Sequence, residues 1–183
     1  MSRSEGGAVR RVVLVGFMCS GKSTVAAELA RRLGWEALDL DREIEAREGR
    51  TVPRIFRESG EAYFRGLEAA VTAEVAGRSG VVLSPGGGWI TNPALLELLG
   101  PGTLSVWLQV SPETVLSRAG PDRAARPLLD VPDPLAAVRR LLAEREPLYR
   151  LAALAVSTDA LDAASAASLI ENEIRARGAA PGG

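Results

Sequence analysis

Eight residues read Gly16-Phe17-Met18-Cys19-Ser20-Gly21-Lys22-Ser23, between an apolar run over 11–15 and an amphipathic segment over 22–33. They fit the pattern G-x-x-x-x-G-K-[ST], whose glycines let the backbone curl so that its N–H groups converge on a phosphate. The N-terminus of the following helix adds positive potential. From average residue frequencies this pattern arises by chance in roughly one chain per hundred of this length. The stretch therefore predicts a nucleotide-phosphate loop.

The basic residue of this loop stands alone, because Lys22 is the only lysine and every other basic residue is arginine. A compact ammonium on a flexible stem fits between β- and γ-phosphate oxygens, where a planar guanidinium does not. Ser23 offers a hydroxyl to Mg²⁺, so we expect ATP as co-substrate and Mg²⁺ as cofactor. For the single cysteine, Cys19, we favour a packing role over redox chemistry. The predicted ATP contacts of the loop are Cys19, Ser20, Gly21, Lys22, Ser23 and Thr24.

Short apolar runs alternate with longer amphipathic stretches along the whole chain. The predicted strands cover 11–15, 37–40, 81–84, 103–110 and 153–157. The predicted helices cover 22–33, 61–78, 92–99, 111–118, 134–146 and 160–177. Strands that alternate with helices indicate a parallel sheet covered on both faces. We therefore expect an α/β three-layer sandwich with a central parallel sheet of about five strands, as one domain over 1–183.

The composition excludes several other classes of function. The formal net charge is −1 and the basic residues are scattered singly, unlike the basic stripe of a nucleic-acid binder. The apolar runs are far shorter than the roughly 20 residues that span a bilayer, and residues 1–9 lack the apolar region of a secretory signal. The absence of histidine leaves acid–base and metal roles to carboxylates, hydroxyls and water. We expect a soluble, cytoplasmic protein with small-molecule partners, without nucleic-acid or membrane partners.

Two polar or glycine-rich segments follow predicted strands, at the edge where ligands of open α/β sheets bind. In Asp39-Leu40-Asp41, strand alternation places both carboxylates on one face. One carboxylate suits an outer-sphere contact with Mg²⁺ and the other suits a hydrogen bond from an attacking hydroxyl; alternatively, Asp41 caps a following helix. Ser84-Pro85-Gly86-Gly87-Gly88 exposes backbone N–H groups, although a plain turn has the same composition.

Taken together, these segments resemble the shikimate kinase family, whose members carry a phosphate loop, a D-x-D after the second strand, an F-R pair, a GGG loop, an R-P-L lid and an R-x-P-L-Y motif. The chain carries all six in this order, and the resemblance covers about residues 10–178. The matching segments are Gly16–Ser23, Asp39–Asp41, Gly60–Arg65, Gly86–Gly88, Arg126–Leu129 and Arg145–Tyr149. The resemblance implies transfer of the γ-phosphoryl group of ATP to the 3-hydroxyl of shikimate, on the way to chorismate and the aromatic amino acids.

The resemblance also implies roles for individual residues. Arg65 and Arg145 match the family's carboxylate-binding arginines, and the guanidinium fork suits a carboxylate. Asp41 matches the residue that orients the 3-hydroxyl, and Asp39 matches the outer-sphere partner of Mg²⁺. The implied catalytic residues are Lys22, Asp41 and Arg126; the substrate-binding residues are Asp41, Arg65, Gly87, Gly88 and Arg145; the metal-binding residues are Ser23 and Asp39. Arg118 and Arg126 match lid arginines and join the ATP-binding set.

Several accessory features accompany these residues. Glu68 follows Arg65 at helical spacing and is placed to brace it, although such a pair is commonly a surface ion pair. Thr158-Asp159 fits the family's adenine-side loop in two residues only. The substrate-binding helical region is expected over about 41–68. The expected wall of the acceptor pocket comprises Val52, Phe56, Phe64, Pro127 and Leu128, each of which is also compatible with ordinary core packing.

The chain departs from the family pattern in the lid and beside two motifs. The segment over about 118–134 reads as a mobile, cationic lid, about one residue longer than usual between its matching arginines, and Arg123 competes for the phosphate-facing role. Pro53 enters a short helix of the family, but it falls in a first turn, where proline is tolerated. Pro85 stands before the glycines, where a larger apolar residue is usual.

Two other functions remain open from the residues alone. The phosphate loop and the D-x-D do not themselves choose an acceptor, so a kinase of another small polyol acid such as gluconate is an alternative. A regulatory module that binds nucleotide without turnover is the other alternative, although Lys22, Ser23 and the paired aspartates are all present. For the kinase we expect a monomer.

Overall fold

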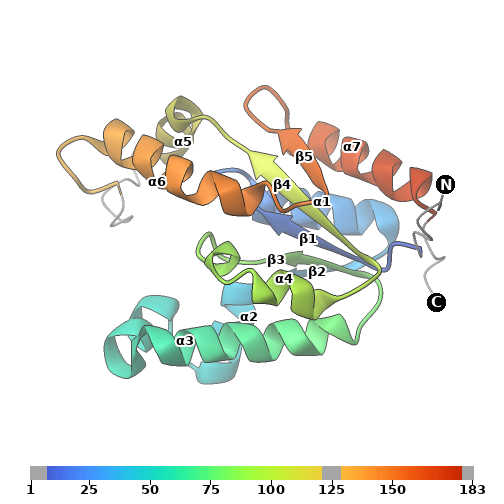
Figure 1. Cartoon of the computed structure of the whole chain (residues 1–183), viewed down its shortest axis with the longest axis horizontal. Helices are drawn as coiled ribbons and strands as arrows, with labels where there is room; N and C mark the ends of the chain where they lie inside the picture. Colours follow the sequence, from blue (N-terminus) through green and yellow to red (C-terminus); the bar gives the residue numbers. More distant parts are fainter. Residues whose placement is uncertain (1–7, 121–128, 179–183) are drawn as a thin grey trace.

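The computed structural model describes residues 8–120 and 129–178, in which strands and helices alternate (Figure 1). The strands are β1 (Arg11–Val15), β2 (Glu36–Asp39), β3 (Val81–Ser84), β4 (Thr103–Gln109) and β5 (Leu154–Ser157). The helices are α1 (Lys22–Leu33), α2 (Leu40–Glu48), α3 (Val52–Ala76), the 3₁₀ turn η1 (Trp89–Thr91), α4 (Ala94–Leu99), α5 (Pro112–Ala119), α6 (Pro134–Tyr149) and α7 (Ala163–Ala176). Within these residues, none of the helices has the length and apolar character needed to cross a membrane.

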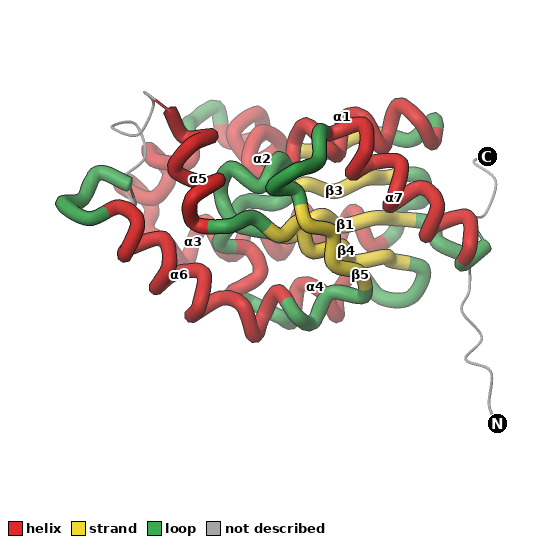
Figure 2. The backbone as a smooth tube through the Cα atoms, turned by 90° about the horizontal axis from the view of Figure 1, so that it is seen from above, coloured by secondary structure: helices red, strands yellow, loops and turns green. Residues whose placement is uncertain are grey.

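The five strands form one sheet in the order β2-β3-β1-β4-β5, and every neighbouring pair is parallel. β1 lies at the centre, where Val12 pairs with Val82 of β3 and with Leu104 of β4. Helices cover both faces of the sheet, α1 and α7 on one side and α4 and α6 on the other (Figure 2). This arrangement confirms the predicted α/β sandwich with a central parallel sheet.

The central strand is buried on both faces, and this burial holds the start of the phosphate loop in place. Successive side chains of a strand point to opposite faces. Val12 and Leu14 therefore pack with α1 and α7, whereas Val13 and Val15 pack with residues of α3 and α4 on the other side. All four are at most 2% exposed. The backbone that enters the loop at Gly16 is thus fixed by core packing on both sides of the sheet.

The apolar periodicity located most elements but did not resolve α2 and the first part of α3, both of which fall in the helical region expected over about 41–68. β1, α1 and β3 have the predicted bounds, and the other predicted elements overlap those observed. α2 buries only Leu40 and Ile44, so it lacks the sustained apolar period that indicates a helix. In α3 the backbone leaves the helical region at Gly60 (φ 82°, ψ 169°), which glycine tolerates, and the helix predicted from residue 61 corresponds to the part after this bend. Pro53 lies in the first turn of α3, as expected.

The prediction that Asp39 and Asp41 project from one face of a strand is wrong, and so is the alternative that Asp41 caps a helix. β2 ends at Asp39, whose carboxylate caps α2 by accepting a hydrogen bond from the Arg42 N–H (3.2 Å). Asp41 lies inside the first turn of α2. The strand stops earlier than alternation suggested because Asp39 is a good N-cap residue in extended conformation.

Candidate active site

The phosphate loop connects β1 to α1, and its first glycine permits a close backbone contact. A Cβ on Gly16 would lie 2.6 Å from the Leu108 carbonyl oxygen of β4, so a larger residue does not fit there. At the other end of the loop, the Lys22 ammonium donates hydrogen bonds to the carbonyl oxygens of Gly16 (2.8 Å) and Phe17 (2.9 Å). The lysine therefore folds back over the loop, in the position from which an ammonium can reach bound phosphates.

The surroundings of Lys22 destabilise its charged form. Although part of the residue reaches solvent, the loop encloses its ammonium, and this loss of hydration lowers the pKa of Lys22 from 10.5 to about 8. The nearby carboxylates of Asp41 and Asp39 oppose this shift, whereas the Arg145 guanidinium adds to it. The ammonium is therefore mostly protonated at neutral pH, but it loses its proton when the pH rises only slightly above neutral.

Ser23 and Asp39 form a pair of oxygen ligands beside the lysine. The Ser23 hydroxyl donates a hydrogen bond to one carboxylate oxygen of Asp39 (3.0 Å), while the other oxygen caps α2. In residues 8–120 and 129–178 there is no group of three or more acidic, thiol or imidazole side chains able to hold a metal ion. A hydroxyl and one carboxylate suit Mg²⁺, which keeps several waters and takes its other oxygens from phosphates.

Next to this pair, Asp41 faces a small polar pocket. The pocket is lined by Met18, Lys22, Ser23, Asp39, Asp41, Ser84, Pro85, Gly86 and Gly87. One carboxylate oxygen of Asp41 is buried and has no hydrogen-bond partner among the described residues. Burial, and then the charge of Asp39, raise the pKa of Asp41, against the attraction of Lys22. An unpaired buried carboxylate oxygen costs free energy, so its position is suited to a hydroxyl donor from a ligand.

The glycine loop after β3 lets three charged side chains approach one another. A Cβ on Gly86 would lie 2.9 Å from a carboxylate oxygen of Asp41, and a Cβ on Gly88 would lie 3.0 Å from an Arg65 guanidinium nitrogen. Between them, the carbonyl oxygen of Gly87 accepts a hydrogen bond from Arg145 (3.1 Å). The absence of side chains on this loop therefore brings the predicted acceptor-side residues together.

Arg65 is held by two carboxylates of its own helix. Its guanidinium donates to Glu68 (2.7 Å) and to Glu61 (3.0 Å). Glu68 is only 1% exposed, so the alternative of a surface ion pair is wrong for this residue. Burial raises the pKa of Glu68, although the charge of Arg65 favours the carboxylate. Glu61, by contrast, is exposed, and its contact with Arg65 is open to competition from a ligand carboxylate.

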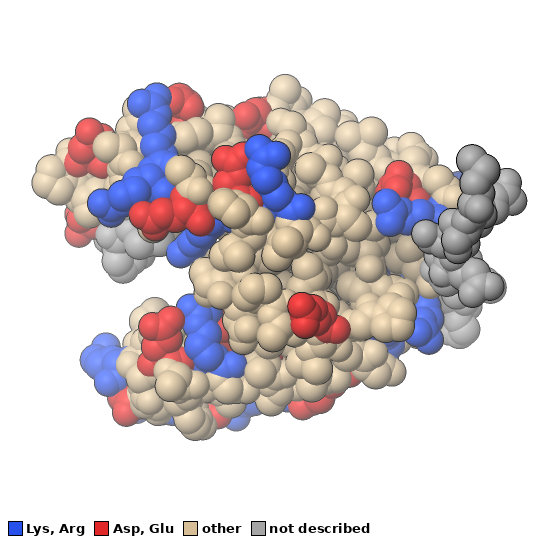
Figure 3. All heavy atoms as spheres, in the orientation of Figure 1, with Lys and Arg blue, Asp and Glu red and all other residues tan. Residues whose placement is uncertain are grey.

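Arg145 reaches the same glycine loop from a different helix. It belongs to α6, and its guanidinium lies over the Phe17 ring, 5.7 Å from the ring centroid. Figure 3 shows the surface hollowed between the part that carries α5 and α6 and the part that carries α2 and α3. Guanidinium groups from α3 and α6 therefore flank the glycine loop from two directions.

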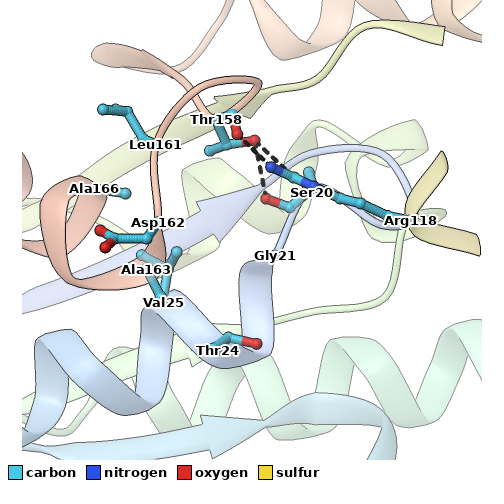
Figure 4. A pocket seen from close by; sticks show the side chains of 10 residues that line it. All are labelled: Ser20, Gly21, Thr24, Val25, Arg118, Thr158, Leu161, Asp162, Ala163 and Ala166. Atoms are coloured by element: carbon cyan, nitrogen blue, oxygen red, sulfur yellow. Dashed lines mark hydrogen bonds between the residues drawn. The ribbon is translucent and has the colours of Figure 1, made fainter. Parts of the chain in front are cut away.

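A second pocket lies on the other side of the phosphate loop, between α1, α5 and α7 (Figure 4). It is lined by Ser20, Gly21, Thr24, Val25, Arg118, Thr158, Leu161, Asp162, Ala163 and Ala166. Arg118 donates hydrogen bonds to the carbonyl oxygens of Cys19 (3.0 Å) and Thr158. The Thr158 hydroxyl lies within hydrogen-bond distance of the carbonyl oxygens of Gln109 (2.9 Å) and Ser20 (3.2 Å). The mainly apolar lining of this second pocket suits a planar base next to the phosphate loop.

The sequence does not by itself point to the apolar part of this second pocket. Leu161, Ala163 and Ala166 come from the segment that follows β5, and their only signal in the sequence is that they are apolar after a predicted strand. The sequence predicts Gly86 as part of the glycine loop, but it does not predict that Asp41 lies against this residue. Four predicted residues, namely Arg123, Arg126, Pro127 and Leu128, lie outside the described residues.

A phosphate loop with its lysine, an adjacent hydroxyl–carboxylate pair and a carboxylate facing a polar pocket define a P-loop kinase for a small acceptor. The family model described as "Shikimate kinase" matches residues 18–175. On this evidence the chain belongs to the shikimate kinase family.

Individual relatives agree with this assignment. A shikimate kinase of Halorhodospira halophila is 51% identical over 140 residues, which are 76% of this chain and 78% of the relative. A shikimate kinase of Moorella thermoacetica is 44% identical over 165 residues, covering 90% and 94%. Among solved structures, shikimate kinase from Acinetobacter baumannii in complex with shikimate has a TM-score of 0.83 and 40% identity, and the match covers 92% of this chain and 94% of that one.

Proposed function

We propose that this protein transfers the γ-phosphoryl group of Mg²⁺-ATP to the 3-hydroxyl of shikimate, giving shikimate 3-phosphate and ADP in the pathway to chorismate. The observation that carries the proposal is the meeting of Asp41, Arg65 and Arg145 around the glycine loop, next to Lys22. Two guanidinium groups suit a compact carboxylate, and a carboxylate with a free oxygen suits a hydroxyl. The similar structure from A. baumannii, which contains shikimate, supports this choice of acceptor.

On the acceptor side, the binding roles follow from the charges. Arg65 and Arg145 bind the shikimate carboxylate, while Gly87 and Gly88 donate backbone N–H groups to substrate or γ-phosphate. Asp41 accepts the hydrogen bond of the 3-hydroxyl. In the transfer, this hydroxyl oxygen forms a bond to the γ-phosphorus as the bond to the β,γ-bridging oxygen breaks, and the hydroxyl proton passes to Asp41. The raised pKa of Asp41 makes the carboxylate a better proton acceptor than an exposed aspartate.

On the nucleotide side, the phosphate loop binds the phosphates through Cys19 to Thr24, and Lys22 neutralises charge on the transferred group. The base occupies the pocket beside Arg118 and Thr158. Arg126, from the lid over about 118–134, is proposed as the arginine that closes over ATP. Ser23 and Asp39 would hold Mg²⁺, which would offset the negative charge of the ATP phosphates during the transfer. The proposal includes a single domain with its core at about 10–178, a substrate-binding region over about 41–68, and a cytoplasmic monomer.

The proposal is tested by following ADP release from Mg²⁺-ATP with shikimate, gluconate, a nucleoside monophosphate or no acceptor. We expect release only with shikimate. Release with gluconate or a nucleotide instead would retain a kinase but exclude shikimate as its substrate. Nucleotide binding without release under any of these conditions would show a non-catalytic binding module.

Replacing Arg145 by alanine is expected to raise the KM for shikimate by about 10- to 100-fold, because a charge-assisted hydrogen bond of roughly 1.5–3 kcal/mol is lost. The KM for ATP should change by less than about threefold. Steady-state kinetics with each substrate varied in turn measures both values. Arg150→Ala is the matched control, because Arg150 lies next to α6 and pairs only with Glu146 among the described residues. Equal increases in both KM values would place Arg145 on the nucleotide side.

The lowered pKa of Lys22 predicts a pH dependence for ATP capture. The ammonium is charged below its pKa of about 8 and neutral above it, so kcat/KM for ATP should fall by about tenfold per pH unit above pH 8. Bound phosphates favour the charged ammonium and raise its pKa, so kcat should remain constant to higher pH than kcat/KM. Profiles between pH 6 and 10 at saturating shikimate measure both. A kcat/KM that is constant up to pH 10 would exclude this titration.

A further inference from the structure

The residue that follows the glycine loop is a fully buried tryptophan joined to the acceptor-side helix. Trp89 has 0% exposed surface and directly follows Gly88. Its indole N–H donates a hydrogen bond to the Thr72 hydroxyl of α3 (3.1 Å), and Thr72 is also 0% exposed. A buried N–H is costly to leave unpaired, so this bond is a strong constraint on where the indole sits.

The direction of the hydrogen bonds is fixed by the chemistry of the two groups. An indole N–H only donates, so the Thr72 hydroxyl must accept from Trp89. The single proton of that hydroxyl is used toward the Glu68 carbonyl oxygen, at 2.6 Å. Glu68 is one turn before Thr72, and its carboxylate holds Arg65. A chain of contacts therefore runs from Trp89 through α3 to the residue that brings Arg65 into place.

The loop before Trp89 is tied to the tryptophan as one unit. The backbone N–H of Trp89 donates to the Gly86 carbonyl oxygen (3.1 Å). Thr91 donates both its backbone N–H (3.1 Å) and its hydroxyl (2.6 Å) to the Gly88 carbonyl oxygen. These bonds close the turn η1 directly after the glycines. The Trp89–Thr72 bond thus joins this turn directly to α3.

The distance between the glycine loop and Arg65 can change only a little without disturbing the contact between them. A Cβ on Gly88 would lie 3.0 Å from the Arg65 guanidinium, so the guanidinium already occupies the space that a side chain would need. A small shift of the loop relative to α3 would either push the guanidinium away or open a gap. The bond between Trp89 and Thr72 joins the same loop region to the same helix α3.

We propose that Trp89 and Thr72 are positioning residues for acceptor binding: their buried hydrogen bond sets the distance between the glycine loop and Arg65, and thereby the affinity for the shikimate carboxylate. This inference rests on the proposed function. It assigns to the two residues a role that acts through Gly88 and Arg65, since neither touches the polar pocket lined by Lys22 and Asp41. The nucleotide pocket likewise does not include them.

The test compares Trp89→Phe, which removes the N–H but keeps an aromatic ring, with Thr72→Val, which removes the hydroxyl, and Thr72→Ser, which retains it. We expect the first two variants to raise the KM for shikimate by about three- to tenfold, with kcat and the KM for ATP within about twofold of wild type. Thr72→Ser should remain within about twofold in all three. Trp35→Phe is the matched control, because Trp35 packs against the α1 and α7 side of the sheet.

A double-variant cycle gives a second readout. Because both substitutions remove the same bond, the Trp89→Phe/Thr72→Val protein should bind shikimate no more than about twofold more weakly than the poorer single variant, measured by titration calorimetry. Wild-type protein without shikimate-dependent turnover would overturn the proposed function and this inference together. An active wild type whose Trp89→Phe and Thr72→Val variants retain the shikimate KM would overturn the inference alone. Equal losses for both substrates, without rescue by Thr72→Ser, would show a packing role and also overturn it.

Discussion

Replacing Lys22 by methionine is expected to reduce kcat/KM for ATP by about 10³-fold, a loss typical of removing one charged or hydrogen-bonding group from a transition state. Methionine has a similar length but no charge, so the substitution removes the ammonium that lies over the Gly16 and Phe17 carbonyl oxygens. The developing charge on the transferred phosphoryl group then has no partner at this position. Initial rates at pH 7, where the ammonium of the wild type is mostly protonated, measure the effect.

Two further variants show whether the loss comes from the charge of Lys22, from the shape of its ammonium group, or from any substitution in helix α1. Lys22→Arg keeps the charge, and we expect it to lose at least about 10²-fold, because a planar guanidinium does not fit between phosphates and loop as an ammonium does. Arg31→Met on the same helix α1 is the control, since Arg31 is an exposed partner of Glu28. Lys22→Arg at wild-type activity would show that any cation suffices here. Lys22→Met at wild-type activity would remove Lys22 from the chemistry.

Replacing Asp41 by asparagine is expected to lower kcat by about 10²- to 10³-fold, within the range for loss of a positioned acid–base group. An amide retains an oxygen for the 3-hydroxyl but takes up no proton. ATP affinity should change by less than about threefold, because Asp41 is assigned to the acceptor hydroxyl and does not line the proposed base site. The measurement is kcat at saturating substrates, together with ATP titration by calorimetry.

This experiment needs an acidic to neutral buffer. Asp41 supports the charge of Lys22, so its loss lowers the pKa of Lys22 further below 8. The comparison is therefore made at about pH 6.5, well below the pKa of Lys22 of about 8 in the wild type, so that a lowered pKa affects the result least. Asp133→Asn is the control, because Asp133 is an exposed cap of α6. An unchanged kcat for Asp41→Asn would exclude it as proton acceptor, and a large loss of ATP affinity would place it on the nucleotide side.

The part of the fold that could be predicted from the sequence is the part with a strong local signal. The phosphate loop lies between β1 and α1 as its motif requires, and the apolar runs became the strands of one parallel sheet. The pairing of Arg65 with Glu68 was visible as helical spacing, whereas the burial of Glu68 was not. Burial depends on which elements pack together, and residue spacing within one helix does not contain that information.

The rest depended on tertiary context. α2 buries only Leu40 and Ile44, so its largely polar sequence has no clear apolar period. Strand alternation gave a wrong reason for the proximity of Asp39 and Asp41, which share a pocket because the chain turns from β2 into α2 between them. The approach of Asp41 to Gly86 joins residues 45 positions apart in the sequence, and no local pattern specifies that contact.

The most direct test of the proposed reaction is phosphorus–proton correlation NMR of a mixture of the protein, Mg²⁺-ATP and shikimate. We predict one new phosphomonoester, formed in equal amount with ADP, whose phosphorus couples to the proton on carbon 3 of shikimate. Phosphorus found only in ATP, ADP and inorganic phosphate, or coupled to another ring position, would contradict the account.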